Sequence, residues 1–131
     1  MQQILIVAAG GSVGAAARYG VSILIARSVS STFPWGTLVV NLTGSFFIGV
    51  FAELFETKLI PAPWRSFTAI GVIGGYTTFS TLMFESMNLI REGEWHLATL
   101  NIVASNVLGI LFVILGMLVC RFSLRQIGSV S

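Results

Sequence analysis

Residues 71–85 read GVIGGYTTFSTLMFE, with two adjacent glycines and then a cluster of threonine and serine, inside a long apolar run. Adjacent glycines and β-branched threonines lower helix propensity, while hydroxyl side chains can bond the backbone groups that a break releases. Irregular backbone within a bilayer is tolerated only where protein buries it or where it lines a cavity. The stretch therefore predicts a membrane helix broken at mid-membrane. The alternative is a continuous packing face whose hydroxyls bond back to the i−4 carbonyls, and the density of the polar cluster favours the break.

This stretch belongs to one of four long apolar runs, which cover residues 4–26, 35–55, 64–90 and 95–120. Each run exceeds the roughly 20 residues that an α-helix needs to cross a hydrocarbon core of about 30 Å. The connections at 27–34, 56–63 and 91–94 are short, so consecutive helices should be antiparallel neighbours. The sequence thus predicts an all-α membrane protein with four transmembrane helices in a single domain over residues 1–131.

Composition supports a membrane protein and excludes several other classes. Of the 131 residues, 55% are apolar and only 9% are charged, whereas an ordinary soluble domain is about 25% charged. Disordered chains are poor in apolar residues, so that class is excluded as well. A single cysteine, Cys120, excludes a disulfide framework or a zinc ribbon. A net charge of +2 is too small for a nucleic-acid-binding surface.

The basic residues are almost evenly divided between the two ends of the predicted helices. One side carries four basic residues, Lys58, Arg65, Arg121 and Arg125. The other side carries Arg27 and Arg91, and also Arg18 if its side chain reaches the interface. This is a weak bias under the positive-inside rule. A single topology with both ends in the cytoplasm agrees with the slight excess, and composition alone modestly favours it. Insertion in both orientations, giving antiparallel dimers, is the second interpretation.

Small and polar residues repeat along one face of the second and the fourth predicted helices. Thr37, Asn41 and Ser45 follow one another at four-residue intervals, as do Asn101 and Ser105. One such face is ordinary interhelical packing, since a membrane asparagine most often hydrogen-bonds a neighbouring helix. Two such faces in one small bundle predict a hydrophilic track.

Two charged residues lie within the predicted spans and allow two interpretations each. Arg18 follows Gly10 and Gly14 at four-residue spacing, on a face that lets another helix approach closely. It is either a snorkelling anchor or a fixed positive charge that attracts an anion. Glu85 is either an end-of-helix residue facing water, or a proton relay or part of an ion path.

Three motifs make the chain resemble the bacterial fluoride channels of the Fluc/CrcB family over nearly its whole length. They are GGYTTFST at 74–81, GTLVVN at 36–41, and the glycine-rich start at 10–14 followed by Arg18. The resemblance implies an antiparallel, dual-topology homodimer with two pores in the bacterial cytoplasmic (inner) membrane. Such a channel exports fluoride from the cytoplasm by passive electrodiffusion and is not an enzyme.

The resemblance also implies particular site residues. The anion pore is expected to include Asn41, Phe79 and Ser105, with the hydroxyls of Ser80 and Thr81 as further donors. Arg18, Thr37 and Glu85 are expected in a vestibule or polar track. A structural sodium ion at the dimer interface is expected on the backbone carbonyls of Gly74 and Thr77. No cluster of acidic and histidine side chains offers a cation site, which agrees with carbonyl ligands of the kind used in ion filters.

Leu82 departs from the family pattern, which has a second pore phenylalanine at this position. A phenyl edge is electropositive and can meet an anion, whereas a leucine side chain cannot. Either Phe79 suffices together with hydroxyl and amide donors, or conduction is altered. A heterodimer with a related second subunit is plausible if Leu82 reflects a pair of paralogues.

Two other functions fit four short membrane helices. A small multidrug-type, proton-coupled transporter needs an acid deep in the first helix, but the first acidic residue here is Glu53. A non-transporting scaffold subunit would use the same glycines for packing, but it gives no reason for the polar cluster at 77–81. A membrane enzyme is disfavoured because neither His96 nor Cys120 has plausible partners nearby in sequence.

Overall fold

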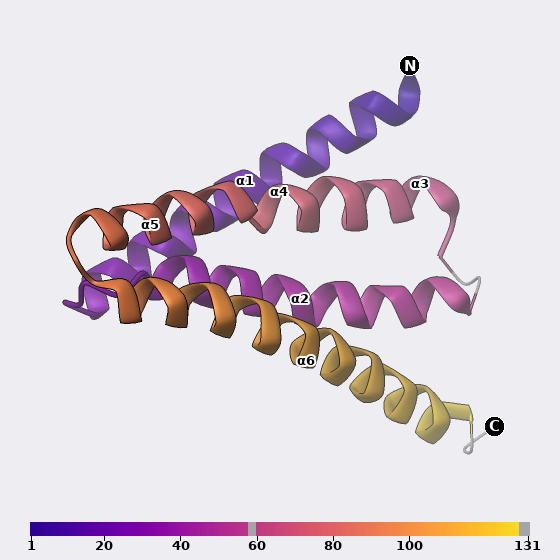
Figure 1. Ribbon diagram of the computed structural model, residues 1–131. Coiled ribbons are helices and arrows are strands. Elements are labelled where there is room, and N and C mark those ends of the chain that lie inside the picture. The colour runs from indigo at the N-terminus through magenta and orange to yellow at the C-terminus, as the bar shows by residue number, and fades with distance from the viewer. Residues whose placement is uncertain (58–59, 129–131) are drawn as a thin grey trace.

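The computed structural model describes residues 1–57 and 60–128, with side chains to residue 126, and Lys58 lies outside this part of the chain. The elements in order are α1 (Gln2–Ser28), α2 (Trp35–Glu56), α3 (Ala62–Arg65), the π-helix η1 (Ser66–Ile73), α4 (Gly74–Tyr76), α5 (Phe79–Arg91) and α6 (Trp95–Gly128). Within the described residues, four helical segments are long and apolar enough to cross a bilayer: Gln2–Ser28, Trp35–Glu56, Ala62–Arg91 and Trp95–Gln126. The prediction of an all-α protein with four spans is confirmed (Figure 1).

The helix boundaries lie close to the predicted ranges except at the end of the last helix. The first three spans begin and end within two residues of 4–26, 35–55 and 64–90. The helix α6 begins at Trp95 as predicted but runs to Gly128, eight residues beyond the predicted end at 120. Residues 121–127 contain no proline or glycine, so nothing in the local sequence stops the helix where charged residues begin.

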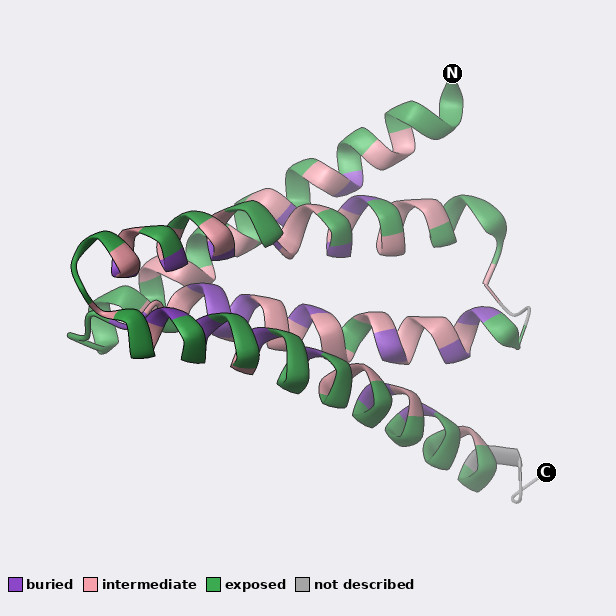
Figure 2. Cartoon of the chain, in the orientation of Figure 1, coloured by how far each residue is buried: buried purple, intermediate pink, exposed green. Residues whose placement is uncertain are grey.

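The bundle buries several polar side chains among apolar ones, and large apolar side chains cover its outside. The buried polar residues are Thr37, Glu53, Thr78, Ser86, Asn101 and Ser105. Most of α6 is exposed (Figure 2), and the exposed residues along it include Leu100, Val103 and Leu111. A helix bundle that keeps its buried polar groups away from an apolar exterior is suited to lipid as its solvent.

Close backbone approaches hold the spans together. The predicted small face of α1 packs on η1, because a Cβ at Gly14 would collide with the carbonyl oxygen of Val72. The helices α2 and α6 meet in the same way, because a Cβ at Gly49 would collide with the carbonyl oxygen of Val113. These glycines are therefore packing residues, as membrane helix interfaces commonly require.

The segment that follows α4 has extended rather than helical backbone. The helix α4 ends at Tyr76, and Thr77 has a ψ of 156°. Thr78 has φ −149° and ψ 118° and forms the N-cap of α5, which begins at Phe79. Its Oγ1 accepts a hydrogen bond of 3.3 Å from the N–H of Thr81, as N-cap hydroxyls do. The eight-residue π-helix before α4 was not predicted from the sequence.

Candidate functional site

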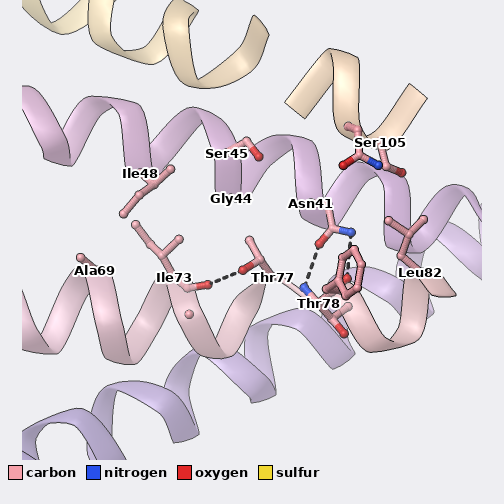
Figure 3. Close-up of a pocket in the computed structure, with 13 residues that line it drawn as sticks. Asn41, Gly44, Ser45, Ile48, Ala69, Ile73, Thr77, Thr78, Leu82 and Ser105 are labelled. Carbon is pink, nitrogen blue, oxygen red and sulfur yellow. Dashed lines mark hydrogen bonds between the residues drawn. The ribbon is translucent and has the colours of Figure 1, made fainter. Parts of the chain in front are cut away.

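A pocket of about 390 Å³ lies between α2, the extended residues before α5, and α6 (Figure 3). Six of the residues predicted for the site line it: Asn41, Gly74, Thr77, Phe79, Leu82 and Ser105. None of its 13 lining residues carries a formal charge. The structure therefore brings together residues from three spans around an uncharged, partly polar pocket.

Asn41 of α2 binds the backbone of Thr78 on both sides of that residue. Its Nδ2 donates to the Thr78 carbonyl oxygen over 3.0 Å, and its Oδ1 accepts from the Thr78 N–H over 2.8 Å (Figure 3). An amide suits this task because it presents a donor and an acceptor side by side. The sequence did not single out Thr78 as a site residue. Its place in the hydroxyl cluster was the only signal, and the pairing with Asn41 required the tertiary structure.

In a continuous helix, the carbonyl oxygens of Gly74 and Thr77 would accept hydrogen bonds from the N–H groups four residues later. The extended backbone directs these N–H groups elsewhere. The N–H of Thr78, four residues after Gly74, donates to the Asn41 side chain over 2.8 Å. The N–H of Thr81, four residues after Thr77, donates to the Oγ1 of Thr78 over 3.3 Å. The carbonyl oxygens of Gly74 and Thr77 are thereby released from their helical partners. Both residues line the pocket.

Ser105 of α6 brings a buried hydroxyl to the same pocket. The residue is 8% exposed, and its Oγ has no hydrogen-bond partner among the described residues. A buried hydroxyl without a partner is costly unless a ligand or water satisfies it. Leu82 of α5 lines the same pocket and is 3% exposed, whereas Phe79 is 69% exposed. Phe79 therefore stands at the open side of the pocket.

A second group of polar residues lies between α1, α2 and α5. Arg18, Thr37 and Thr81 line a pocket of about 380 Å³, and a neighbouring pocket of about 530 Å³ is lined by Thr37, Thr81 and Glu85. The Oγ1 of Thr37 donates to Oε1 of Glu85 over 2.8 Å. The residues predicted for the vestibule or track are thus gathered in one place.

The structure places two predicted pore residues outside the first pocket. Thr81 lines the second group, in contact with Thr78 through hydroxyls 3.0 Å apart. Ser80 is exposed and lines none of these three pockets, although its Oγ lies 3.4 Å from the Oγ1 of Thr78. Thr78 lines the first pocket and the second group together, so it joins the two polar regions.

Fold and site together define a multi-pass integral membrane protein whose spans enclose a pocket lined by uncharged side chains. A family model described as "CrcB-like protein, Camphor Resistance (CrcB)" matches residues 5–117. The chain belongs to this CrcB family, as its motifs predicted.

Curated relatives agree with this assignment and carry the name of a channel. The chain is 45% identical over 119 residues to the "Fluoride-specific ion channel FluC" of Opitutus terrae, covering 88% of this chain and 90% of the relative. It is 46% identical over 115 residues to the protein of the same name from Rhodospirillum rubrum, covering 86% and 89% of the two chains. It is 47% identical over 119 residues to "Fluoride-specific ion channel FluC 1" of Nitrobacter hamburgensis, covering 90% and 94%.

Proposed function

We propose that this protein is a fluoride channel that lets fluoride leave the cytoplasm by passive electrodiffusion. Membership of the CrcB family and the names of its relatives support fluoride as the permeant ion. The structural observation that carries the proposal is the buried, unpartnered hydroxyl of Ser105 in an uncharged pocket. Fluoride is small and tightly hydrated, so a dry pore must replace its water with close donors.

Neutral groups supply those donors in the proposed pore. One amide hydrogen of Asn41 is used on Thr78, and the second is free to point toward an anion because a side-chain amide carries two. The Ser105 hydroxyl donates its proton, and the positive edge of the Phe79 ring meets the anion. Neutral donors bind an anion more weakly than a fixed cation does, which suits conduction because an ion must also leave its site.

Arg18, Thr37 and Glu85 form the proposed vestibule, which Thr81 also lines. The exposed Ser80 hydroxyl is a further proposed donor, 3.4 Å from the Oγ1 of Thr78. Arg18 raises the local concentration of anions at the entrance. The Thr37 hydroxyl is held by Glu85 over 2.8 Å, so it turns its proton toward the carboxylate. The Thr78 hydroxyl donates to Oγ1 of Thr81 over 3.0 Å, so the Thr81 hydroxyl provides the proton that an anion meets between the two polar regions.

A sodium ion on the carbonyls of Gly74 and Thr77 is part of the proposal, as a structural ion at a dimer interface. The chemistry of the donors fits, because both carbonyls are released from their helical partners and hard cations prefer oxygen ligands. When bound, such an ion supplies positive charge that offsets part of the cost of an anion in a low-dielectric interior. Gly74 is exposed on the single chain, which leaves room for ligands from a second copy.

We further propose an antiparallel homodimer with two pores, in which the extended residues Thr77 and Thr78 break the third span at mid-membrane. Gly74 and Phe79 line the pocket and are exposed, so the pocket opens at the surface of the single chain. A pore needs a closed wall, and a second copy in the opposite orientation supplies it. The near balance of basic residues between the two ends permits insertion in both directions.

Leu82 distinguishes this channel from the family pattern that predicts two pore phenylalanines. Its side chain is 3% exposed and lines the pocket beside Ser105. We propose that Phe79 is the only aromatic anion contact contributed by this chain, and that the hydroxyl and amide donors make up the rest. A related second subunit that supplies the missing phenylalanine is the competing arrangement.

The two alternative functions are less well supported. A proton-coupled multidrug transporter lacks its acid in the first helix, since Glu53 is the first acidic residue. A packing scaffold gives no use for a buried hydroxyl left without a partner or for carbonyls released from their helix.

The proposed function is tested by fluoride efflux from liposomes. Purified protein is reconstituted into vesicles loaded with sodium and potassium fluoride, a potassium ionophore sets the voltage, and an electrode records released fluoride. We expect rapid efflux from these vesicles, none from protein-free vesicles, and no chloride release in a matched chloride experiment. Absence of fluoride efflux would refute the channel.

The dimer is tested by labelling a cysteine in the α5–α6 connection. Glu92→Cys in a Cys120→Ser background is exposed to a membrane-impermeant thiol reagent on intact cells, then on opened membranes. Dual topology predicts that about half of the chains react on intact cells. Labelling of all or none of the chains would establish a single topology, and a purified complex that contains a second sequence would replace the homodimer with a heterodimer.

A further inference from the structure

The hydroxyl of Tyr76, a residue that does not line the pocket of the proposed pore, links the end of α4 to α2. It lies 2.9 Å from the Oγ1 of Thr43. Tyr76 also lines a pocket of about 280 Å³ whose other lining residues are apolar, among them Phe47 and Phe51. No residue in that pocket competes for the tyrosine hydroxyl, so its single side-chain partner in the described structure is Thr43.

The direction of this hydrogen bond follows from counting protons. The Thr43 hydroxyl donates to the carbonyl oxygens of Val39 over 2.7 Å and of Val40 over 3.1 Å. A hydroxyl has one proton and two lone pairs, so Thr43 must accept from Tyr76. The tyrosine is therefore the donor at the end of a short relay into the α2 backbone, and phenylalanine in its place removes this bond while retaining the ring.

Three consecutive residues around the start of the extended segment contact α2, each in a different way. Tyr76 donates to Thr43, Thr78 is held by Asn41, and the methyl group of Thr77 occupies the space that a Cβ at Gly44 would need. Thr77 lies between two hydrogen-bonded anchors. Its carbonyl direction depends on both, because a peptide plane is fixed by the residues on either side of it.

We propose that Tyr76 is a positioning residue for conduction, which acts through Thr43 to fix the last turn of α4 and the orientation of the Gly74 and Thr77 carbonyls. Tyr76 lines none of the three pockets of the proposed ion path. This inference rests on the proposed fluoride channel. It gives a role to Tyr76, because the glycines, threonines and serine of the 74–81 motif already account for the break in the third span without it.

The test is a double-mutant cycle in the liposome assay. Tyr76→Phe, Thr43→Val and the combination of both are compared with the unmodified protein, with rates normalised to folded protein in the vesicles. Loss of one neutral hydrogen bond corresponds to a change of about three- to fivefold in an equilibrium. We expect each single variant to slow fluoride efflux by about that factor, and the double variant to be no slower than either one.

Two further variants separate positioning from general destabilisation. Thr43→Ser keeps the hydroxyl and should restore efflux to near the unmodified rate. Thr99→Val removes a hydroxyl that bonds only the carbonyl of Trp95 in its own helix, over 3.0 Å, and should leave efflux unchanged. Normal efflux in Tyr76→Phe, additive losses in the double variant, or no rescue by serine would each overturn the positioning role. An unmodified protein that conducts no fluoride refutes the channel itself, which is a different result from a conducting protein with an indifferent Tyr76.

Discussion

Replacing Asn41 with aspartate changes one atom in the bond that holds the extended backbone. The acceptor at Oδ1 is kept, so the 2.8 Å bond from the Thr78 N–H survives. The donor Nδ2 is lost, and a carboxylate oxygen then faces the Thr78 carbonyl oxygen where the amide donated over 3.0 Å. The variant thereby leaves one backbone carbonyl unsatisfied and adds a negative charge beside the proposed anion path.

The size of the effect follows from that single lost donor. A buried acceptor left without its partner costs about 1–3 kcal/mol, which is about a 5- to 150-fold change in an equilibrium. Repulsion between the carboxylate and fluoride adds to this in the same direction. We expect Asn41→Asp to lower fluoride efflux at neutral pH at least about fivefold.

Protonation of the new side chain supplies a check within the same assay. A protonated carboxyl regains an O–H donor and loses its charge, so efflux through Asn41→Asp should rise as the pH falls. The unmodified protein has no such group at this position, and protein-free vesicles correct for the passage of hydrogen fluoride through lipid. Asn88→Asp is the matched control, because it makes the same chemical change at a residue that lines none of the pockets of the proposed ion path.

Two results would refute this reasoning. Efflux equal to that of the unmodified protein at neutral pH would show that the bond to Thr78 does not support conduction. Loss of efflux that acidification leaves unchanged would show that the donor and the charge are not the cause.

Three further predictions concern the pore and the packing around it. Phe79→Ile should lower fluoride efflux severalfold, because an aliphatic side chain has no positive edge; unchanged efflux would remove Phe79 from the pore. Gly49→Ala should lower the thermal stability measured in detergent, since its Cβ would collide with the carbonyl oxygen of Val113; a stable variant would contradict this packing. The buried carboxylate of Glu53 accepts a hydrogen bond from Arg121 Nε over 2.7 Å, and Arg121→Ala removes this partner. The single variant should therefore destabilise the fold by more than the double variant Arg121→Ala with Glu53→Gln, which also removes the charge. Equal losses of stability in the two variants would exclude coupling.

The number of spans and the class of fold follow directly from the sequence. Four apolar runs longer than a bilayer needs are a local property, and they identify helices whatever their neighbours are. The end of α6 was placed eight residues too early because charge marks the edge of the membrane rather than the end of a helix. The motif at 74–81 likewise led to the family, which the family model and the curated relatives confirm.

The site could be predicted only in part. Asn41 and Ser105 were expected in the anion pore, and Gly74 and Thr77 at a sodium site; the structure shows that all four line one pocket. The placement of Thr81 on the far side of Thr78 was not expected.

Four membrane crossings, and the unusual composition of residues 74–81, can be recognised from the amino-acid sequence alone. The pairing of Asn41 with Thr78 and the contact between the hydroxyls of Tyr76 and Thr43 arise only when the helices pack. The physical reason is that lipid is as apolar as the side chains facing it. The apolar residues of a membrane helix therefore form no pattern that selects which helix packs against it. Its partners are set by close contacts between backbones far apart in the sequence, and those exist only once the helices have packed.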